Sequence, residues 1–454
     1  MGRETDTGER RVVRALLAGI CLPLLDATIV VLALDTFGQR FGAPLAHTQW
    51  VLSGYTLAAA SAVPVCAWAA NRIGVRRLWM GGLGVFLAGS CLSGCAGSLG
   101  GLVAARCLQG LGCGILTPTL QTALVRSMRP DRVRAALATA AVPAVVAPIL
   151  GPLLGGLLLK AAGWRWLFLA NLPLGLLALV TAHRGLPADE PLGRARFDAQ
   201  GFLLLAPGLA AVTFGLAWVA RNGWSGPGWA LPVGLSLVGA FALRPAPADR
   251  ESLVDLSLFR LRAFTGCGLT LFLSSAAFYG GLLLLPLNLG RGWGPTGVGA
   301  LLAVQGVGAL VARSRLAALS RILGDRALAR ASLVVAILAT LAFAGPWGPP
   351  ATALALAALL ARGAGLGLVT LLTLSAAYQD LDKVQVAHAS VVSRILNQMG
   401  AALGGVLAAA LLQHLLQARA GPGMAHGVAA LGLAAITAAA LLPTGLLSGR
   451  ERSG

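Results

Sequence analysis

The chain has 454 residues, of which 57% are apolar and 11% are charged. Soluble domains carry about 25% charged residues, so this composition excludes an ordinary soluble protein and predicts an integral membrane protein. The formal net charge of +19 could suit a nucleic-acid partner, but the charges form short clusters between apolar runs, and we expect no nucleic acid to bind.

Apolar runs follow one another along the whole chain, bounded by Arg, Asp or Gly and Pro residues. A membrane-spanning helix needs about 20 predominantly apolar residues. We therefore predict an all-α integral membrane protein with 14 transmembrane helices. The predicted spans are 12–34, 48–70, 78–97, 99–121, 135–159, 164–182, 199–219, 229–243, 264–287, 297–312, 328–345, 351–377, 386–416 and 425–447.

The basic residues between these runs give the orientation, because cytoplasmic loops are enriched in Lys and Arg. With the N-terminus in the cytoplasm, 26 of the 35 Lys and Arg residues fall on the inner side and 6 on the outer side. The other three, Arg106, Arg362 and Arg394, fall within spans. We expect a multi-pass protein of the plasma or inner membrane with both termini in the cytoplasm.

The first span has an aspartate in its middle, within the sequence LLDATIVVLAL of residues 24–34. An ionised carboxylate there costs about 2.5–3.5 kcal/mol even on a lenient insertion scale. In the fourth span, Arg106 lies at a depth similar to that of Asp26, ~12 Å from the outer surface. Either the two residues form a proton-coupling pair, or they form a fixed ion pair that joins spans 1 and 4.

A carboxylate in this position can bind or release a proton as its surroundings change, because burial favours its neutral form and a nearby guanidinium favours its charged form. Asp26 is the only one of sixteen acidic residues that is predicted deep in the membrane, since Asp35 lies at the outer end of its span. A pump for divalent cations would need more acidic residues.

Polar and aromatic residues of several other spans could line a substrate cavity. Such a lining suits neutral, monocationic or acidic amphiphiles. The expected lining residues are Tyr55, Gln109, Phe278, Tyr279, Gln305, Arg362, Arg394, Asn397 and Gln398. Alternatively, Arg362 and Arg394 bond to backbone carbonyls and never meet the substrate.

Three pairs of segments indicate an internal repeat. GPLLGG at 151–156 resembles GAALGG at 400–405, and AANRIG at 69–74 resembles ALSRILG at 318–324. QGLGCG at 109–114 shares its glycine spacing with RGAGLG at 362–367. Ordered matches at similar offsets predict two homologous six-span halves with an inserted pair of spans, which is typical of transporters that rock about a midplane site. The alternative is chance, because glycine-rich spans are common.

The predicted domains follow from this repeat. They are a cytoplasmic tail at 1–11, a first six-helix bundle at 12–184, an inserted helix pair at 198–244, a cytoplasmic linker at 245–263, a second six-helix bundle at 264–447, and a cytoplasmic tail at 448–454.

Six segments resemble the signatures of one known family. They are LDATIVVLAL at 25–34, WVLSGYTLA at 50–58, LVAARCLQGLGCG at 102–114, PILGPLLGG at 148–156, GWRWLFLANLPLG at 163–175 and LVDLSLFRLRAF at 253–264. On these segments the chain resembles the major facilitator superfamily, and within it the fourteen-span drug:proton antiporter family of the EmrB and QacA type.

The resemblance implies roles for two groups of residues. One is an antiporter motif that bends the fifth span and seals a leak path, formed by Pro148, Gly151, Pro152, Gly155 and Gly156. The other is a gating loop that locks one conformation, formed by Asn71, Arg72, Gly74, Arg76 and Arg77. The chain has Asn71 where the family has an aspartate, Ala67 where it has a glycine, and Ser320 in the second copy. An amide does not form an ion pair, so we expect a softer lock.

These patterns predict a proton-coupled exporter of amphipathic small molecules, such as antibiotics or toxic compounds, that works as a monomer by rocking-bundle alternating access. Its partners would be the substrate, protons and the lipid bilayer, and its energy source the proton gradient rather than a cofactor. The alternatives are a metabolite importer or facilitator on the same fold, a membrane enzyme, or a sensor. The sequence has no visible catalytic set, no metal-ligand cluster and no phosphate-binding lysine motif, which argues against an enzyme and against ATP as the energy source.

Overall fold

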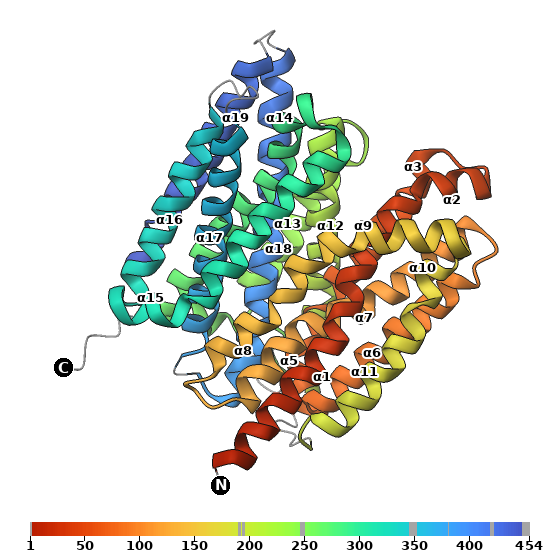
Figure 1. The fold of residues 1–454 in the computed structure, drawn as a ribbon. Coiled ribbons are helices and arrows are strands. Elements are labelled where there is room, and N and C mark those ends of the chain that lie inside the picture. The colour runs from red at the N-terminus through yellow and green to blue at the C-terminus, as the bar shows by residue number, and fades with distance from the viewer. Residues whose placement is uncertain are drawn as a thin grey trace. The chain divides into compact units, whose positions relative to one another are not determined.

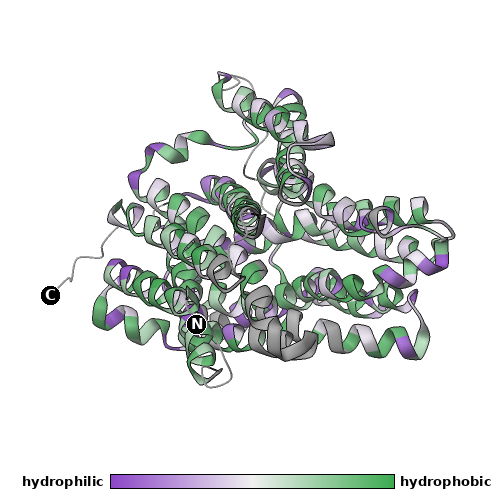
Figure 2. Ribbon diagram, turned by 90° about the horizontal axis from the view of Figure 1, so that it is seen from above, coloured by the Kyte–Doolittle hydropathy of each residue, from purple (hydrophilic) through white to green (hydrophobic). Residues whose placement is uncertain are grey.

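The computed structural model describes residues 2–188, 192, 196–245, 250–344, 352–379, 381–417 and 422–446. The described chain is almost entirely helical (Figure 1), with hydrophobic residues along most of the helices (Figure 2). The predicted cytoplasmic tail at 448–454 lies outside the described residues. Residues 1–214, 230–255 and 380–394 form one compact unit, and residues 215–229, 256–379 and 395–454 form a second.

The first unit contains most of the helices of the N-terminal half. They are α1 (Gly2–Ile29), α2 (Leu34–Phe41), α3 (Leu45–Thr48), α4 (Trp50–Ala62), α5 (Val65–Ile73), α6 (Val75–Gly94), α7 (Leu99–Ser127), α8 (Val133–Ala140), α9 (Val142–Ala162), α10 (Trp166–Leu169), α11 (Asn171–Gly185), most of α12 (Ala199–Asn222), and α13 (Ala230–Leu243). A short 3₁₀ helix, η1 (Val30–Ala33), joins α1 to α2.

The second unit contains the helices of the C-terminal half. They are α14 (Arg262–Ser314), α15 (Leu316–Leu323), α16 (Asp325–Leu341), α17 (Thr352–Ala377), the greater part of α18 (Lys383–Gln417), and α19 (Pro422–Ala439). Its described residues also include the 3₁₀ helices η2 (Gly226–Trp229), η3 (Leu256–Arg260), η4 (Ala342–Ala344) and η6 (Pro443–Leu446). The boundary between the units passes through α12 and α18.

Within the described residues, ten helices are long and apolar enough to cross a membrane, or eleven when the pair α4 and α5, bent by 54°, counts as one span. The prediction of an all-α membrane protein is therefore confirmed. The count of fourteen spans stays a prediction.

One predicted boundary was wrong. The sequence predicted a loop between spans ending at 287 and beginning at 297, whereas α14 is a single helix of 53 residues that covers both ranges. The loop was predicted from Gly and Pro residues. Both are more frequent in membrane helices than in soluble ones, because neighbouring helices can satisfy the backbone groups that proline frees. A high density of Gly and Pro residues is therefore a poor predictor of a loop in this chain.

Glycines set the close packing inside each unit, as expected where lipid provides no hydrophobic drive between helices. In α7, a side chain at Gly110 or Gly114 would meet the backbone of α4, and one at Gly112 would meet the backbone of α6. In α17, a side chain at Gly363 or Gly367 would meet α14, and one at Gly365 would meet α16. The two Gly-x-Gly-x-Gly motifs thus make corresponding contacts in the two units.

The ends of the inserted pair are joined by polar contacts. Residues Arg196–Phe197 (β1) pair in parallel with Arg250–Glu251 (β2). The buried Asp198 carboxylate caps α12 by accepting from the Gly201 amide at 2.9 Å, and it forms an ion pair with Arg244. The Phe197 ring contacts Trp68 of α5 with 4.9 Å between centroids. These contacts hold the start of α12 and the end of α13 together and against α5.

Candidate functional site

A buried polar network surrounds Asp26 in the first unit. We call its members, Asp26, Ser90, Arg106, Gln109 and Asn171, the Asp26 network. The side chains of Asp26 and Arg106 have 0% exposure, and Arg106 Nη1 lies 2.5 Å from Asp26 Oδ2. Asp26 Oδ1 accepts from Gln109 Nε2 at 3.0 Å and from Asn171 Nδ2 at 3.1 Å. The structure thus brings together the pair that the sequence placed at equal depth.

Ser90 of α6 completes this network. Its hydroxyl accepts from Gln109 Nε2 at 3.2 Å and from Asn171 Nδ2 at 3.0 Å, and it donates to the Phe168 carbonyl at 2.9 Å. The network therefore draws one or more side chains from each of α1, α6, α7 and α11. A shared network of this kind fixes the orientation of each member, because moving one member leaves the others without partners.

Arg106 has further contacts that fix its guanidinium. Its Nε donates to the Val51 carbonyl at 3.3 Å, and its Nη1 donates to Gln109 Oε1 at 2.6 Å. The guanidinium carbon lies 4.1 Å from the centroid of the Tyr55 ring, which provides a cation–π contact. Its Nη2 has no hydrogen-bond partner in the described part of the chain.

The geometry fits an ionised Asp26. Each described hydrogen bond to the carboxylate is donated by its neighbour, and an ionised carboxylate acts only as an acceptor. Asp26 Oδ1 accepts two of these hydrogen bonds and Asp26 Oδ2 accepts one, so each oxygen of the carboxylate is held by a neighbouring donor.

The second unit buries an arginine without an acidic contact among the described residues. Arg362 of α17 has 0% exposure. Its Nε donates to Thr340 Oγ1 at 3.2 Å, its Nη1 to Gln305 Oε1 at 3.1 Å, and its Nη2 to the Ala277 carbonyl at 2.5 Å. This arrangement agrees with the alternative in which Arg362 bonds to a backbone carbonyl.

The remaining residues predicted to line a cavity lie in varied surroundings. Asn397 donates to Ser275 Oγ at 2.7 Å, and Phe278 packs against the buried Ala277, Ala336 and Leu366. Tyr279 is 40% exposed. Gln398 is half-buried, as is Arg394, whose Nε is buried without a described hydrogen-bond partner.

The antiporter motif packs α9 against α1. A side chain at Gly151 would meet Thr28, and one at Gly155 would lie 3.1 Å from both Ile29 and Leu32, whereas Gly156 has open space. The side chains of Pro148 and Pro152 lie outside the described residues, although both prolines belong to α9. The described glycines therefore allow close approach of the two helices.

The gating loop joins α5 to α6. Asn71 is fully buried and accepts from Arg126 Nη2 at 2.5 Å. Arg126 also donates from Nε to the Lys383 carbonyl at 2.8 Å, and Arg76 donates to the His183 carbonyl at 2.6 Å. Gly74 ends α5 with φ at +94°, a conformation that favours glycine. Arg72 and Arg77 are exposed.

Sequence reasoning missed Ser90, Asn171, Arg126 and Lys383. Asn171 could have been found, because it is a polar residue within the apolar segment GWRWLFLANLPLG. The other three lack a local signal. Ser90 lies among small residues, and Arg126 and Lys383 read as ordinary cytoplasmic charges.

Comparisons with known proteins identify the family of the chain. The model of the Major Facilitator Superfamily matches residues 16–409. A multidrug resistance protein B homolog of Mycobacterium tuberculosis is 34% identical over 416 residues, covering 87% of this chain and 76% of the relative. The putative multidrug resistance protein MdtD of Escherichia coli O6:H1 is 30% identical over 296 residues, covering 60% of this chain and 62% of the relative.

Two solved structures share the fold. The human organic anion transporter MFSD10 matches with a TM-score of 0.66 at 19% identity, covering 97% of this chain and 99% of that one. The proton:xylose symporter XylE matches with a TM-score of 0.65 at 13% identity, covering 98% of this chain and 97% of that one.

Proposed function

This chain belongs to the major facilitator superfamily as a multi-pass membrane transporter, not an enzyme, and we propose that it is a proton-coupled antiporter that exports amphipathic small molecules. Relatives at 30–34% identity carry the name multidrug resistance protein, which supports antibiotics or toxic compounds as the substrate class. The fourteen spans of the EmrB and QacA type, cytoplasmic termini and a monomeric state belong to the same proposal.

The Asp26 network is the observation that carries the proposal. Asp26 is a fully buried acid that accepts hydrogen bonds from Arg106 and Gln109 of α7 and from Asn171 of α11. A proton that binds Asp26 removes the charge that Arg106 compensates. Arg106 is then free to turn toward other acceptors, and the helices it joins lose one contact.

In the proposed cycle, a proton from outside binds Asp26 and releases Arg106, after which the carrier rocks inward. Substrate from the inside then favours return of Arg106 to the carboxylate, which expels the proton to the cytoplasm. One proton that moves inward across 100 mV releases ~2.3 kcal/mol. The cycle can use this energy for export only if the loading and release of the proton stay coupled to transport. The close packing of α1 and α9 at Gly151 and Gly155 supports a seal against leakage.

The deciding experiment uses Asp26→Asn in proteoliposomes with and without a pH gradient. The amide keeps the shape of the side chain but cannot ionise, and its NH2 group cannot accept the hydrogen bonds that one of the two carboxylate oxygens accepts. Uphill export should therefore be lost while downhill exchange continues. Asp35→Asn is the matched control, because Asp35 is exposed at the outer end of the same apolar run, and it should export like the parent.

Substrate-induced proton release from the purified protein tests the same step directly. The parent and Asp35→Asn should release protons when a substrate is added, and Asp26→Asn should not. Equal release from Asp26→Asn would mean that Asp26 is not the coupling group and that the pair with Arg106 only joins helices.

Topology is tested with reporter fusions. A reporter placed after Arg321 should lie in the cytoplasm, and one placed within 345–350, which is outside the described residues, should lie outside the cell. A cytoplasmic signal from 345–350 would exclude the fourteen-span arrangement.

A further inference from the structure

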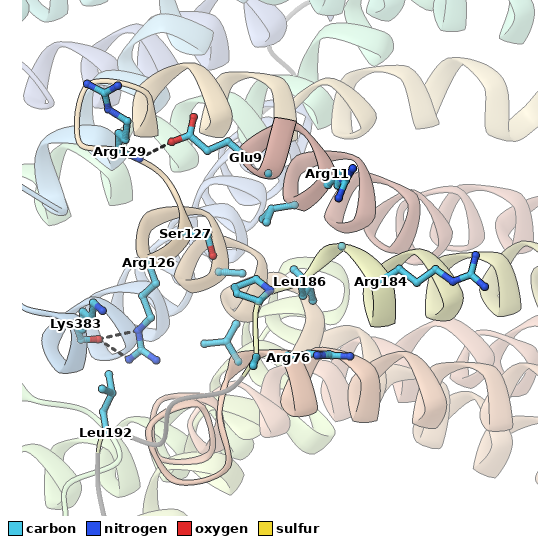
Figure 3. Close-up of a pocket in the computed structure, with 17 residues that line it drawn as sticks. Glu9, Arg11, Arg76, Arg126, Ser127, Arg129, Arg184, Leu186, Leu192 and Lys383 are labelled. Atoms are coloured by element: carbon cyan, nitrogen blue, oxygen red, sulfur yellow. Dashed lines mark hydrogen bonds between the residues drawn. The ribbon is translucent and has the colours of Figure 1, made fainter. Parts of the chain in front are cut away.

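A basic pocket lies in the first unit, apart from the Asp26 network. Its volume is about 630 Å³, within the usual range of about 300–1,000 Å³ for small-molecule sites. Residues at the ends of α1, α6, α7, α11 and α18 line it (Figure 3). Its charged side chains are six cations and one acid, namely Arg11, Arg76, Arg126, Arg129, Arg184, Lys383 and Glu9.

Described ion pairs involve Glu9 and Arg129. Glu9 accepts from Arg132 at 3.0 Å, and Arg129 lies 3.3 Å from Asp131. The described acceptors of Arg126 are neutral, namely the Asn71 side chain and the Lys383 carbonyl. The described acceptors of Arg76 are the backbone carbonyl and ring nitrogen of His183.

The lining of the pocket has more cations than acids. The sequence places two further acids, Asp189 and Glu190, between the lining residues Ala188 and Leu192. Counting these two and Glu9 against the six lining cations still leaves more cations than acids. Like charges that line one pocket repel each other, and a bound anion would relieve that repulsion.

We propose that this pocket binds the phosphate group of an anionic ligand. Guanidinium groups form paired, charge-assisted hydrogen bonds with phosphate oxygens. Val75, Leu186 and Leu192 add an apolar side to the same pocket, which suits the glycerol and first methylenes of a phospholipid. Basic pockets at the cytoplasmic ends of membrane helices bind such headgroups, and a free phosphate compound would use the same cations.

Binding would affect the whole unit, because the lining residues come from five helix ends that are distant in sequence. A ligand that binds only the folded arrangement stabilises it, and the stabilisation grows with the ratio of the ligand concentration to its dissociation constant. The site does not depend on the proposed proton coupling, since none of its residues belongs to the Asp26 network.

The test measures anion binding by the purified, delipidated full-length protein in neutral detergent. The lipid probe is phosphatidylglycerol, compared with phosphatidylcholine, and the soluble probe is inorganic phosphate, compared with chloride at equal ionic strength. Each probe is titrated while the midpoint of thermal unfolding is recorded. Phosphatidylglycerol or inorganic phosphate should raise the midpoint of the parent more than its comparison does.

The variant pair is matched for charge. Arg11→Gln/Arg184→Gln removes two exposed lining cations, and Arg14→Gln/Arg315→Gln removes two exposed arginines that do not line the pocket. The first should weaken the apparent affinity about tenfold or more, as expected for the loss of charge-assisted hydrogen bonds. The second should stay within about twofold of the parent.

The outcomes separate the ligand sources. A response to phosphatidylglycerol alone assigns the pocket to a lipid headgroup, and a response to inorganic phosphate assigns it to a free phosphate compound. No anion-specific stabilisation of the parent, or equal losses in both double variants, would overturn the proposal. If the double variant does not fold, Arg11→Gln and Arg184→Gln are each compared with Arg14→Gln in the same way.

Discussion

The two units bury an arginine in similar scaffolds but give it different partners. In the first unit Arg106 faces the carboxylate of Asp26, and in the second Arg362 faces Gln305, Thr340 and the Ala277 carbonyl. The scaffolds correspond, because the glycines of α7 and α17 contact their neighbours in the same pattern. The polar groups inside the two scaffolds therefore differ, while the helix packing at these glycines corresponds.

This difference bears on the proposed function. The described partners of Arg362 are neutral oxygens, whereas the Asp26 network contains a carboxyl group. The proposed proton coupling is therefore assigned to the first unit, while the contacts of Arg362 are suited to holding helices together.

The largest expected effect compares Arg106→Gln with Arg362→Gln. Removing Arg106 leaves a buried carboxylate without its cation, and breaking a buried pair in this way costs about 3–5 kcal/mol. Removing Arg362 leaves neutral acceptors, at a cost of about 1–3 kcal/mol. Arg106→Gln should abolish substrate-induced proton release, whereas Arg362→Gln should retain it.

Thermal unfolding and proton release are measured on both variants in the same detergent. If Arg362→Gln loses proton release while it remains folded, the assignment of coupling to the first unit is wrong. If both variants lose the same stability and neither loses proton release, the two arginines have the same structural role.

The second comparison concerns glycines in corresponding positions of the two units. Gly151 and Gly400 each face a neighbouring helix without room for a side chain, whereas Gly156 and Gly405 face open space. Alanine at the first two should lower the unfolding midpoint, because overpacking costs about 1–3 kcal/mol. Alanine at the last two should keep or raise it, since alanine is favoured over glycine in helices by about 1 kcal/mol.

These four variants form their own control, because each makes the same chemical change. Changes of opposite sign in the unfolding midpoint, for the two alanine variants of each unit, would support a repeat in the helix packing. A lower midpoint for Gly151→Ala but not for Gly400→Ala would limit the correspondence between the units to sequence.

The sequence was sufficient for the parts of the fold that depend on local pattern. Apolar runs of about 20 residues predicted membrane helices, and one deep acid with one deep base predicted the pair Asp26 and Arg106. The correspondence between the two Gly-x-Gly-x-Gly motifs was visible from their spacing, because a side chain at each of these glycines would meet a neighbouring helix.

Other parts depend on contacts between residues distant in the chain. Ser90 and Arg126 acquire their roles from Asn171 and Lys383, which lie 81 and 257 residues away, and no local pattern indicates those partners. The helix α14 was misjudged for a related reason. Whether Gly and Pro break a membrane helix depends on which neighbouring groups form hydrogen bonds with the freed backbone groups.

The smallest expected effect concerns the gating loop, where Asn71→Asp would restore the acid that the family motif carries. Asn71 is fully buried and accepts from Arg126 at 2.5 Å, and Arg126 also donates to the Lys383 carbonyl. A charged acceptor strengthens that hydrogen bond by about 1 kcal/mol, which shifts a two-state equilibrium about fivefold. The state that contains these contacts should become more populated.

The measurement is the labelling rate of Tyr279→Cys, at a position that is 40% exposed, in a background with the exposed Cys91 and Cys95 replaced by serine. Asn222→Asp, at an exposed position, should leave the rate unchanged. An unchanged rate in Asn71→Asp as well would show that this loop does not control the equilibrium, and the softer lock expected from its amide would have no consequence for transport.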